Sequence, residues 1–196
     1  MNPDAPGRVL VLGIGNILWA DEGFGVRAAE ALHEAWELPP QVSVVDGGTQ
    51  GLGLLPWVED ADTLLVLDAV DYGLSPGTLC TVDDDEVPRY LSAKKMSLHQ
   101  TSFQDVLGLA ALHGRVPSRM RLIGAQPAEL DDYGGSLSPL LQACVQPAVR
   151  EALRFLAELG LPARARSGGG APALAPPSVA LRAYESGRPG DAEPGR

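Results

Sequence analysis

The chain has 196 residues and a formal net charge of −10, from 25 acidic and 15 basic side chains. This length predicts one domain, and the acidic charge argues against a general nucleic-acid binder and against a binder of anionic membranes. No stretch approaches the roughly 20 apolar residues of a membrane span, and the N-terminus lacks a signal-peptide pattern, so we expect a cytoplasmic protein. Its two cysteines, Cys80 and Cys144, are too few and too far apart for a disulfide framework or a CxxC metal site.

The first predicted element is a strand that leads into a glycine-rich turn. Its apolar run, Val9–Leu12, is typical of a strand buried on both faces at the centre of a parallel sheet. A short apolar hook, Ile17–Trp19, follows the turn and ends in two adjacent acids. From residue 23 to residue 37 apolar side chains recur at three- and four-residue spacing, which predicts an amphipathic helix with Asp21 as its N-cap.

Strands and helices then alternate along the chain, which predicts an α/β fold: three layers, α/β/α, around a mostly parallel, twisted sheet of about five strands. An acidic run, Asp83–Glu86, suits the edge of this sheet, and Pro88–Met96 is predicted as a loop. The further predicted strands are Val42–Val45, Thr63–Leu67, Thr78–Val82 and Arg119–Ile123, and the further helices are Leu52–Val58, one that begins at the capping box Ser97–Gln100, and Ser138–Gly160.

The composition changes after Leu161. Glycine and proline become frequent, and too few apolar residues remain to build a core. We therefore divide the chain into a folded domain, residues 1–162, and a tail, residues 163–196, that is expected to be largely disordered or at most loosely docked and to add little to stability.

The glycine-rich turn raises a first functional hypothesis, dinucleotide binding. Gly13 and Gly15 follow a strand, and Asp46 ends the second strand, where a ribose-binding acid would lie. However, Leu18 takes the place of the third glycine, and the acids that follow would repel a pyrophosphate. A nucleotide cofactor is therefore not expected, and nucleotide binding is kept as the weaker alternative.

The carboxyl ends of the predicted strands point to a second hypothesis, a metal site. Glu22 follows the first strand, Asp46 and Asp68 end the second and third, and His99 lies in the first turn of a capped helix. One imidazole with two or three carboxylates suits a divalent metal such as nickel or zinc. A helix N-terminus disfavours the imidazolium form, so His99 would stay neutral, as a metal ligand must.

Each of these residues also has a structural interpretation. Glu22 could complement a helix dipole, Asp68 could cap a turn, and His99 could be a solvated first-turn residue. His33 and His113 lack a nearby acid at ligand spacing and are taken as structural or solvated. No HExxH, GxSxG or CxxC motif is present, so the common hydrolase signatures are missing.

Four motifs in order resemble the hydrogenase maturation endopeptidases, which trim the large subunit of nickel–iron hydrogenases. The family's opening G-x-G-N-x-L-x-x-D-[DE]-G-x-G resembles Gly13–Gly25, and its D-G-G-T resembles Asp46–Thr49. Its strand-end D-A resembles Asp68-Ala69, and its S-x-H-[QE] resembles Ser97–Gln100. The resemblance spans residues 8–159, which is the whole predicted domain, and does not include the tail.

This resemblance implies an endopeptidase that removes a C-terminal peptide from the nickel-loaded precursor of a nickel–iron hydrogenase large subunit. Its nickel-contacting residues, carried over by motif, are Glu22, Asp68 and His99, and the metal is expected to be carried by the substrate. A catalytic role is assigned to Glu22 or Asp68, either of which could activate water. The alternative on the same fold is a non-catalytic, nickel-binding maturation chaperone, since the same three ligands would serve it. No nucleic acid or membrane partner is expected.

Overall fold

A computed structural model of the chain describes residues 7–93, 101–167, 171, 173 and 174. Its centre is a five-stranded sheet with the order β3-β1-β4-β6-β5, in which β5 alone runs antiparallel to its neighbour. The strands are β1 (Val9–Ile14), β3 (Val42–Gly48), β4 (Thr63–Ala69), β5 (Leu79–Asp83) and β6 (Arg119–Ala125).

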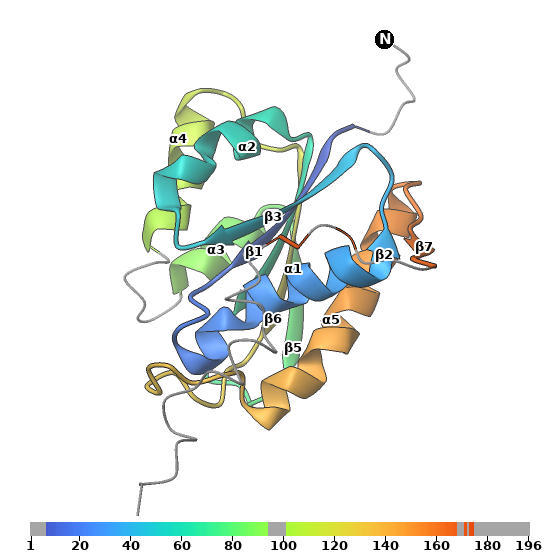
Figure 1. The fold of residues 1–196 in the computed structure, drawn as a ribbon. Coiled ribbons are helices and arrows are strands. Elements are labelled where there is room, and N and C mark those ends of the chain that lie inside the picture. Colours follow the sequence, from blue (N-terminus) through green and yellow to red (C-terminus); the bar gives the residue numbers. More distant parts are fainter. Residues whose placement is uncertain (1–6, 94–100, 168–170, 172, 175–196) are drawn as a thin grey trace, which may run out of the picture.

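Helices cover both faces of this sheet (Figure 1). One face is covered by α1 (Phe24–Ala35) and α5 (Pro139–Glu158), and the other by α2 (Leu55–Asp60), α3 (Glu86–Ala93) and α4 (Thr101–Leu112). Two short 3-10 helices, η1 (Ala20–Gly23) and η2 (Gly51–Leu54), precede α1 and α2. The predicted three-layer α/β/α fold with a mostly parallel sheet is therefore confirmed.

The central strands are buried because helices pack on both of their faces. Every residue of β1 and β4 is buried, which explains their uninterrupted apolar runs. Along β4, Leu65 and Leu67 face the layer of α1 and α5, whereas Leu64 and Val66 face the layer of α2, α3 and α4. This alternation fixes the side on which each residue at the end of the strand lies.

The predicted loop at Pro88–Met96 is wrong for residues 88–93, because these belong to α3, which runs from Glu86 to Ala93. Pro88 occupies the first turn of this helix, where the backbone N–H that proline lacks would have no intrahelical partner. Val87 and Leu91 are buried against the sheet and hold the helix there. The predicted capping box Ser97–Gln100 lies outside the described residues.

The predicted edge strand and the predicted start of the last helix are both confirmed. β5 lies at one edge of the sheet, and its Asp83 accepts two hydrogen bonds from Arg121 of β6, of 2.6 and 2.9 Å. These bonds hold the pKa of Asp83 below its ordinary value. Ser138 is the N-cap of α5, with its Oγ accepting from the backbone N–H of Leu141 at 3.4 Å, and Pro139 is the first helical residue.

The first residues of the predicted tail are paired with the folded domain. β7 (Arg164–Ala165) pairs antiparallel with β2 (Trp36–Glu37), which directly follows α1. The backbone N–H of Arg166 donates to the Ala35 carbonyl at 2.9 Å, and its guanidinium donates to the carbonyls of His33 and Trp36. These bonds satisfy carbonyls at the C-terminal end of α1, where no intrahelical donor is available.

Truncation of the tail at two points tests how much this pairing stabilises the fold. A chain that ends at Pro162 lacks β7, Arg166 and Leu174, which packs against the core. A chain that ends at Leu174 keeps all three. We expect the shorter chain to be less stable than the longer one by about 1–3 kcal/mol, because charge-assisted and backbone hydrogen bonds are lost. Thermal unfolding of the two chains measures the difference, and equal melting temperatures would show that residues 163–174 contribute nothing.

Candidate active site at the carboxyl edge of the sheet

The glycines of the opening motif let the chain fold tightly against the ends of β1 and β4. Gly15 has a φ of +133°, and a Cβ there would lie 1.8 Å from the carbonyl oxygen of Glu22. A Cβ on Gly25 would lie 2.1 Å from the Leu67 carbonyl oxygen and 2.3 Å from that of Ile14. Side chains at these positions are sterically excluded, so the glycines bring η1 and α1 into contact with the strand ends.

Asp21 is not an N-cap, so that prediction is wrong. The residue lies in η1, and α1 begins after Gly23 without any side-chain cap. Asp21 is fully buried, and its carboxylate accepts hydrogen bonds from the backbone N–H groups of Ala128, Glu129 and Ser138 at 2.8, 2.9 and 2.7 Å. It also accepts from the Ser138 hydroxyl at 2.9 Å. Asp21 therefore fixes the loop between β6 and α5 to the opening motif.

Glu22, the neighbour of Asp21, is partly exposed at the same edge. Its backbone N–H donates to the Trp19 carbonyl at 2.9 Å, which closes the hook that precedes it. The 3-10 helix that carries Glu22 lies against β4. The acid pair is thus divided by environment: the first carboxylate is buried in a structural network, and the second remains accessible for chemistry.

Asp68 lies at the carboxyl end of the central strand β4 and is fully buried. By the alternation of the strand it belongs to the face covered by α2, α3 and α4. Tyr72 lies close by: burial raises the pKa of its phenol, and the negative charge of Asp68 raises it further. The Tyr72 hydroxyl donates to the Tyr90 carbonyl at 2.7 Å, and the two rings meet edge to face at 4.7 Å.

Asp46 does not share the site of Asp68. In the sheet register Asp46 pairs with Gly13, and Gly13 pairs with Leu67, so Asp46 lies on the face of α1 and α5. There it interacts with Arg27, a buried residue of α1 that donates to Glu30 at 2.9 Å. Burial raises the pKa of both Asp46 and Glu30. The sequence pattern placed Asp46 and Asp68 at the same edge of the sheet. The strand register shows that they lie on opposite faces of it.

His99, the third predicted ligand, lies outside the described residues. In the sequence, residues 94–100 lie between α3 and α4, two of the three helices that cover the Asp68 face. Among the residues that the structure describes, no three His, Cys, Asp or Glu side chains form a group that could hold a metal ion. The three-ligand site therefore stays a prediction. His113 is exposed, and its Nδ1 lies 2.5 Å from Glu59 Oε1 on α2, a structural contact in line with the prediction that it is structural or solvated.

Gln126 is an organising residue that the sequence analysis missed. Its side-chain oxygen accepts from the backbone N–H groups of Tyr72 and Leu74 at 2.9 and 3.1 Å, and its amide nitrogen donates to Asp71 Oδ1 at 3.0 Å. One buried amide thus holds the loop that follows Asp68. A polar residue directly after a buried strand and before a proline was the available signal.

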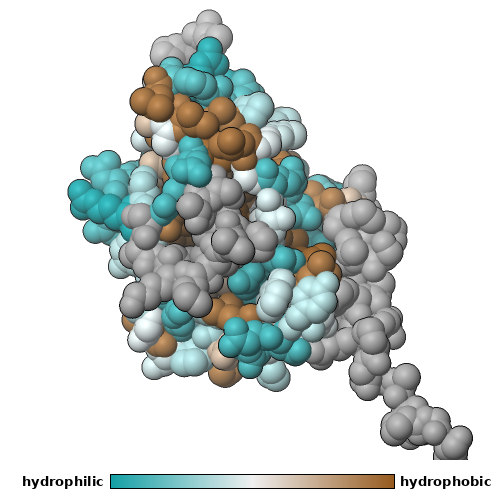
Figure 2. All heavy atoms as spheres, turned by 90° about the vertical axis from the view of Figure 1, so that its left-hand side faces the viewer, coloured by the Kyte–Doolittle hydropathy of each residue, from teal (hydrophilic) through white to brown (hydrophobic). Residues whose placement is uncertain are grey.

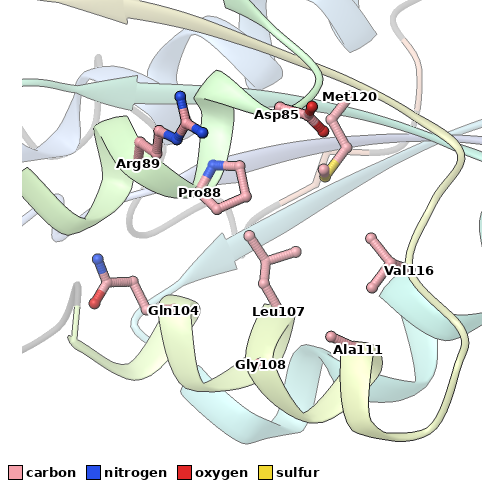
Figure 3. A pocket seen from close by; sticks show the side chains of 9 residues that line it. All are labelled: Asp85, Pro88, Arg89, Gln104, Leu107, Gly108, Ala111, Val116 and Met120. Atoms are coloured by element: carbon pink, nitrogen blue, oxygen red, sulfur yellow. The ribbon is translucent and has the colours of Figure 1, made fainter.

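One cavity of the described structure lies away from this edge. This cavity is a groove of about 590 Å³ between α3 and α4, and its lining includes Leu107, Val116 and Met120 (Figure 3). Met120 is near the beginning of β6 and pairs with Leu64, four residues before Asp68. The groove therefore lies toward the amino ends of the parallel strands, and we do not assign the peptidase site to it.

The comparisons with known proteins decide the family. The sequence profile of hydrogenase maturation proteases matches residues 26–155. The chain is 59% identical over 185 residues to the hydrogenase expression/formation protein HupD of Thiocapsa roseopersicina, covering 93% of this chain and 84% of that protein. It is 41% identical to the hydrogenase 2 maturation protease of Escherichia coli K12 over 80% of this chain and 94% of that protein.

The chain belongs to the hydrogenase maturation protease family. A solved structure, the hydrogenase maturating endopeptidase HybD from Escherichia coli, superposes with a TM-score of 0.77 at 39% identity and covers 81% of this chain and 98% of that one. The family resemblance inferred from the four motifs is confirmed, and the chain is a peptidase of this family. The aligned share with HupD is larger than residues 1–162 alone could supply, so part of the tail also aligns with a family member.

Substitution of Asp21 tests the structural role that separates it from Glu22. Asp21→Ala removes the buried carboxylate and leaves four donors without their acceptor, and we expect a loss of about 3–5 kcal/mol in the free energy of unfolding. Asp21→Asn keeps one acceptor oxygen and should lose less. Chemical denaturation of the two variants measures both values. If Asp21→Ala lowers the free energy of unfolding by less than about 1 kcal/mol, Asp21 does not hold the loop between β6 and α5 as described.

Proposed function

We propose that this protease removes a C-terminal peptide from the nickel-loaded precursor of a nickel–iron hydrogenase large subunit. The observation that carries the proposal is that a buried carboxylate, Asp68, and a partly exposed one, Glu22, lie on two elements that contact each other at the carboxyl edge. Open α/β sheets hold their sites at this edge. The family supplies the reaction class, and the names of its relatives point to a hydrogenase as the protein that is processed.

The nickel would arrive with the substrate rather than reside in the protease. Glu22, Asp68 and His99 would supply two carboxylates and one imidazole, a donor set that suits a borderline divalent ion. A shell of three protein ligands is incomplete, so it binds free metal weakly and is completed by ligands from the precursor. Dependence of cleavage on the metal would then make the protease act only after nickel insertion.

Hydrolysis needs a base that removes a proton from water as the water attacks the scissile carbonyl. Glu22 or Asp68 can take that proton and return it to the leaving amide nitrogen. When bound, the metal would polarise the carbonyl as a Lewis acid. The partly exposed position of Glu22 gives water access, whereas burial of Asp68 favours a fixed ligand orientation. We therefore favour Glu22 as the base.

The alternative, a nickel-binding chaperone without peptidase activity, would use the same three ligands. Cleavage separates the two functions, because only the peptidase changes the mass of the precursor. A nucleotide-dependent enzyme would instead be stabilised against heat by NAD or ATP, and we expect no such shift. No helix in the part of the chain that the structure describes could span a membrane, and the cytoplasmic location stays a prediction.

The decisive assay incubates the full chain with nickel-loaded precursor and measures the product by mass spectrometry. We expect Glu22→Gln, Asp68→Asn and His99→Ala to lower the processing rate by at least about 10²-fold, since each removes a ligand or a base. His113→Ala and Asp105→Asn are matched controls on exposed positions of the α4 region and should process normally.

Melting temperatures of the five variants establish that each one is folded. Normal processing by His99→Ala would remove His99 from the site. An unchanged precursor mass with the wild-type chain, under conditions where binding is demonstrated, would contradict the peptidase function and favour the chaperone.

A further inference from the structure

Four exposed apolar side chains surround the carboxyl edge of the sheet. Leu18 is 39% exposed, Leu74 42%, Tyr133 68% and Leu140 51%. Leu18 lies in the hook after β1, Leu74 in the loop after β4, Tyr133 in the loop after β6, and Leu140 in the first turn of α5. We call these four residues the apolar rim. The hook, the loop after β6 and the start of α5 lie together at the lower end of the molecule (Figure 1).

Hydrogen bonds hold the segments of the rim together as one surface. The backbone N–H of Gly134 donates to the Leu18 carbonyl at 2.7 Å, and the rings of Trp19 and Tyr133 meet at 5.1 Å. Gln126 fixes Leu74, as described above, and its backbone carbonyl accepts from the N–H of Gly77 at 2.9 Å. Gly77 in turn packs beside Leu140. The rim is therefore preorganised, which lowers the entropic cost of binding a ligand.

The rim adjoins the segments that carry the two carboxylates of the site. Trp19, next to Leu18, accepts the backbone hydrogen bond of Glu22. Tyr72, two residues before Leu74, is close enough to Asp68 for that charge to raise the pKa of its phenol. A polypeptide that lies across the rim would thus pass the residues assigned to cleavage.

In the described segments that carry the rim, the charged side chains are all of one sign. Glu129, Asp131 and Asp132 are exposed next to Tyr133, and Asp71 precedes Leu74. The segments 16–23, 70–78 and 126–140 contain no Lys or Arg, and the whole chain carries a formal charge of −10. An anionic surface favours a cationic partner and disfavours an anionic one.

We propose that the apolar rim binds a stretch of the substrate polypeptide that carries both large apolar and basic side chains. This inference rests on the proposed function, since it names what the protease recognises beyond the metal. Apolar side chains of the substrate would cover Leu74, Tyr133 and Leu140, while its Lys or Arg residues would pair with the acids beside them. Isolated exposed apolar residues are common on protein surfaces, but four on a fixed surface next to a site indicate binding.

Three fluorescent peptides of 15 residues test this specificity by anisotropy with the full chain. One is composed of Lys and Leu, one of Glu and Leu, and one of Lys and Ser. We expect the Lys/Leu peptide to bind at least tenfold more tightly than either of the others, and to weaken with added salt. Equal affinity for the Glu/Leu peptide would overturn the charge argument, and equal affinity for the Lys/Ser peptide would overturn the apolar one.

Matched variants locate the binding. Leu140→Ser and Leu74→Ser should each weaken Lys/Leu binding about tenfold, whereas Leu112→Ser, at a residue of α4 that is 83% exposed, should not. Asp131→Lys should weaken it similarly, whereas Glu34→Lys, the same change of charge at an exposed position of α1, should not. Hydrophobic residues also gather on the face of α2 and α4 (Figure 2). Loss of binding in Leu112→Ser alone would move the binding there and overturn the proposal.

The same variants separate this inference from the proposed function. If the wild-type chain processes the nickel-loaded precursor and the rim variants do so with an unchanged KM, the rim is not a substrate surface although the protease function holds. An increase of about tenfold in KM with kcat nearly unchanged is the expected result. If the wild-type chain does not process the precursor at all, the protease function fails whatever the peptides show.

Discussion

The carboxyl edge of this protein depends on one buried carboxylate. Asp21 accepts four hydrogen bonds from the loop between β6 and α5, a segment more than 100 residues away in the chain. A buried charge is tolerated only when donors surround it, so the loop has to adopt the conformation that supplies them. Because Glu22 follows Asp21 directly, the same constraint fixes the position from which Glu22 acts.

The fold separates structural from chemical carboxylates by face and by depth. Asp46 is drawn to the face of α1 by the register of β3 and by Arg27, whereas Asp68 lies on the opposite face. Gln126 accepts backbone hydrogen bonds from the loop after β4, just as Asp21 accepts them from the loop after β6. Gln126 does so with a neutral amide, and Asp21 with a carboxylate. Two buried polar side chains thus organise three loops, and the groups assigned to chemistry need not stabilise the fold as well.

Much of the fold could be predicted because its signals are local. The buried run Val9–Leu12, the edge strand before Asp83 and the cap at Ser138 each depend on a few neighbouring residues. The role of Asp21 was missed because its partners are remote in sequence, and a local rule placed it at a helix cap. Docking of Arg166 was missed for the same reason: its acceptors belong to the end of α1. Glu22, Asp68 and His99 were selected by motif, and the structure describes the first two.

The central claim is that Glu22, Asp68 and His99 together form a site that binds a metal ion at the carboxyl edge of the sheet. The most direct measurement is an anomalous difference map from crystals of the full chain soaked in cadmium, a divalent ion whose position is easily located. The account predicts one peak within ligand distance of the Glu22 and Asp68 carboxylates and the His99 imidazole. A peak beside Asp46 and Glu30, with none at Glu22, Asp68 and His99, would contradict it.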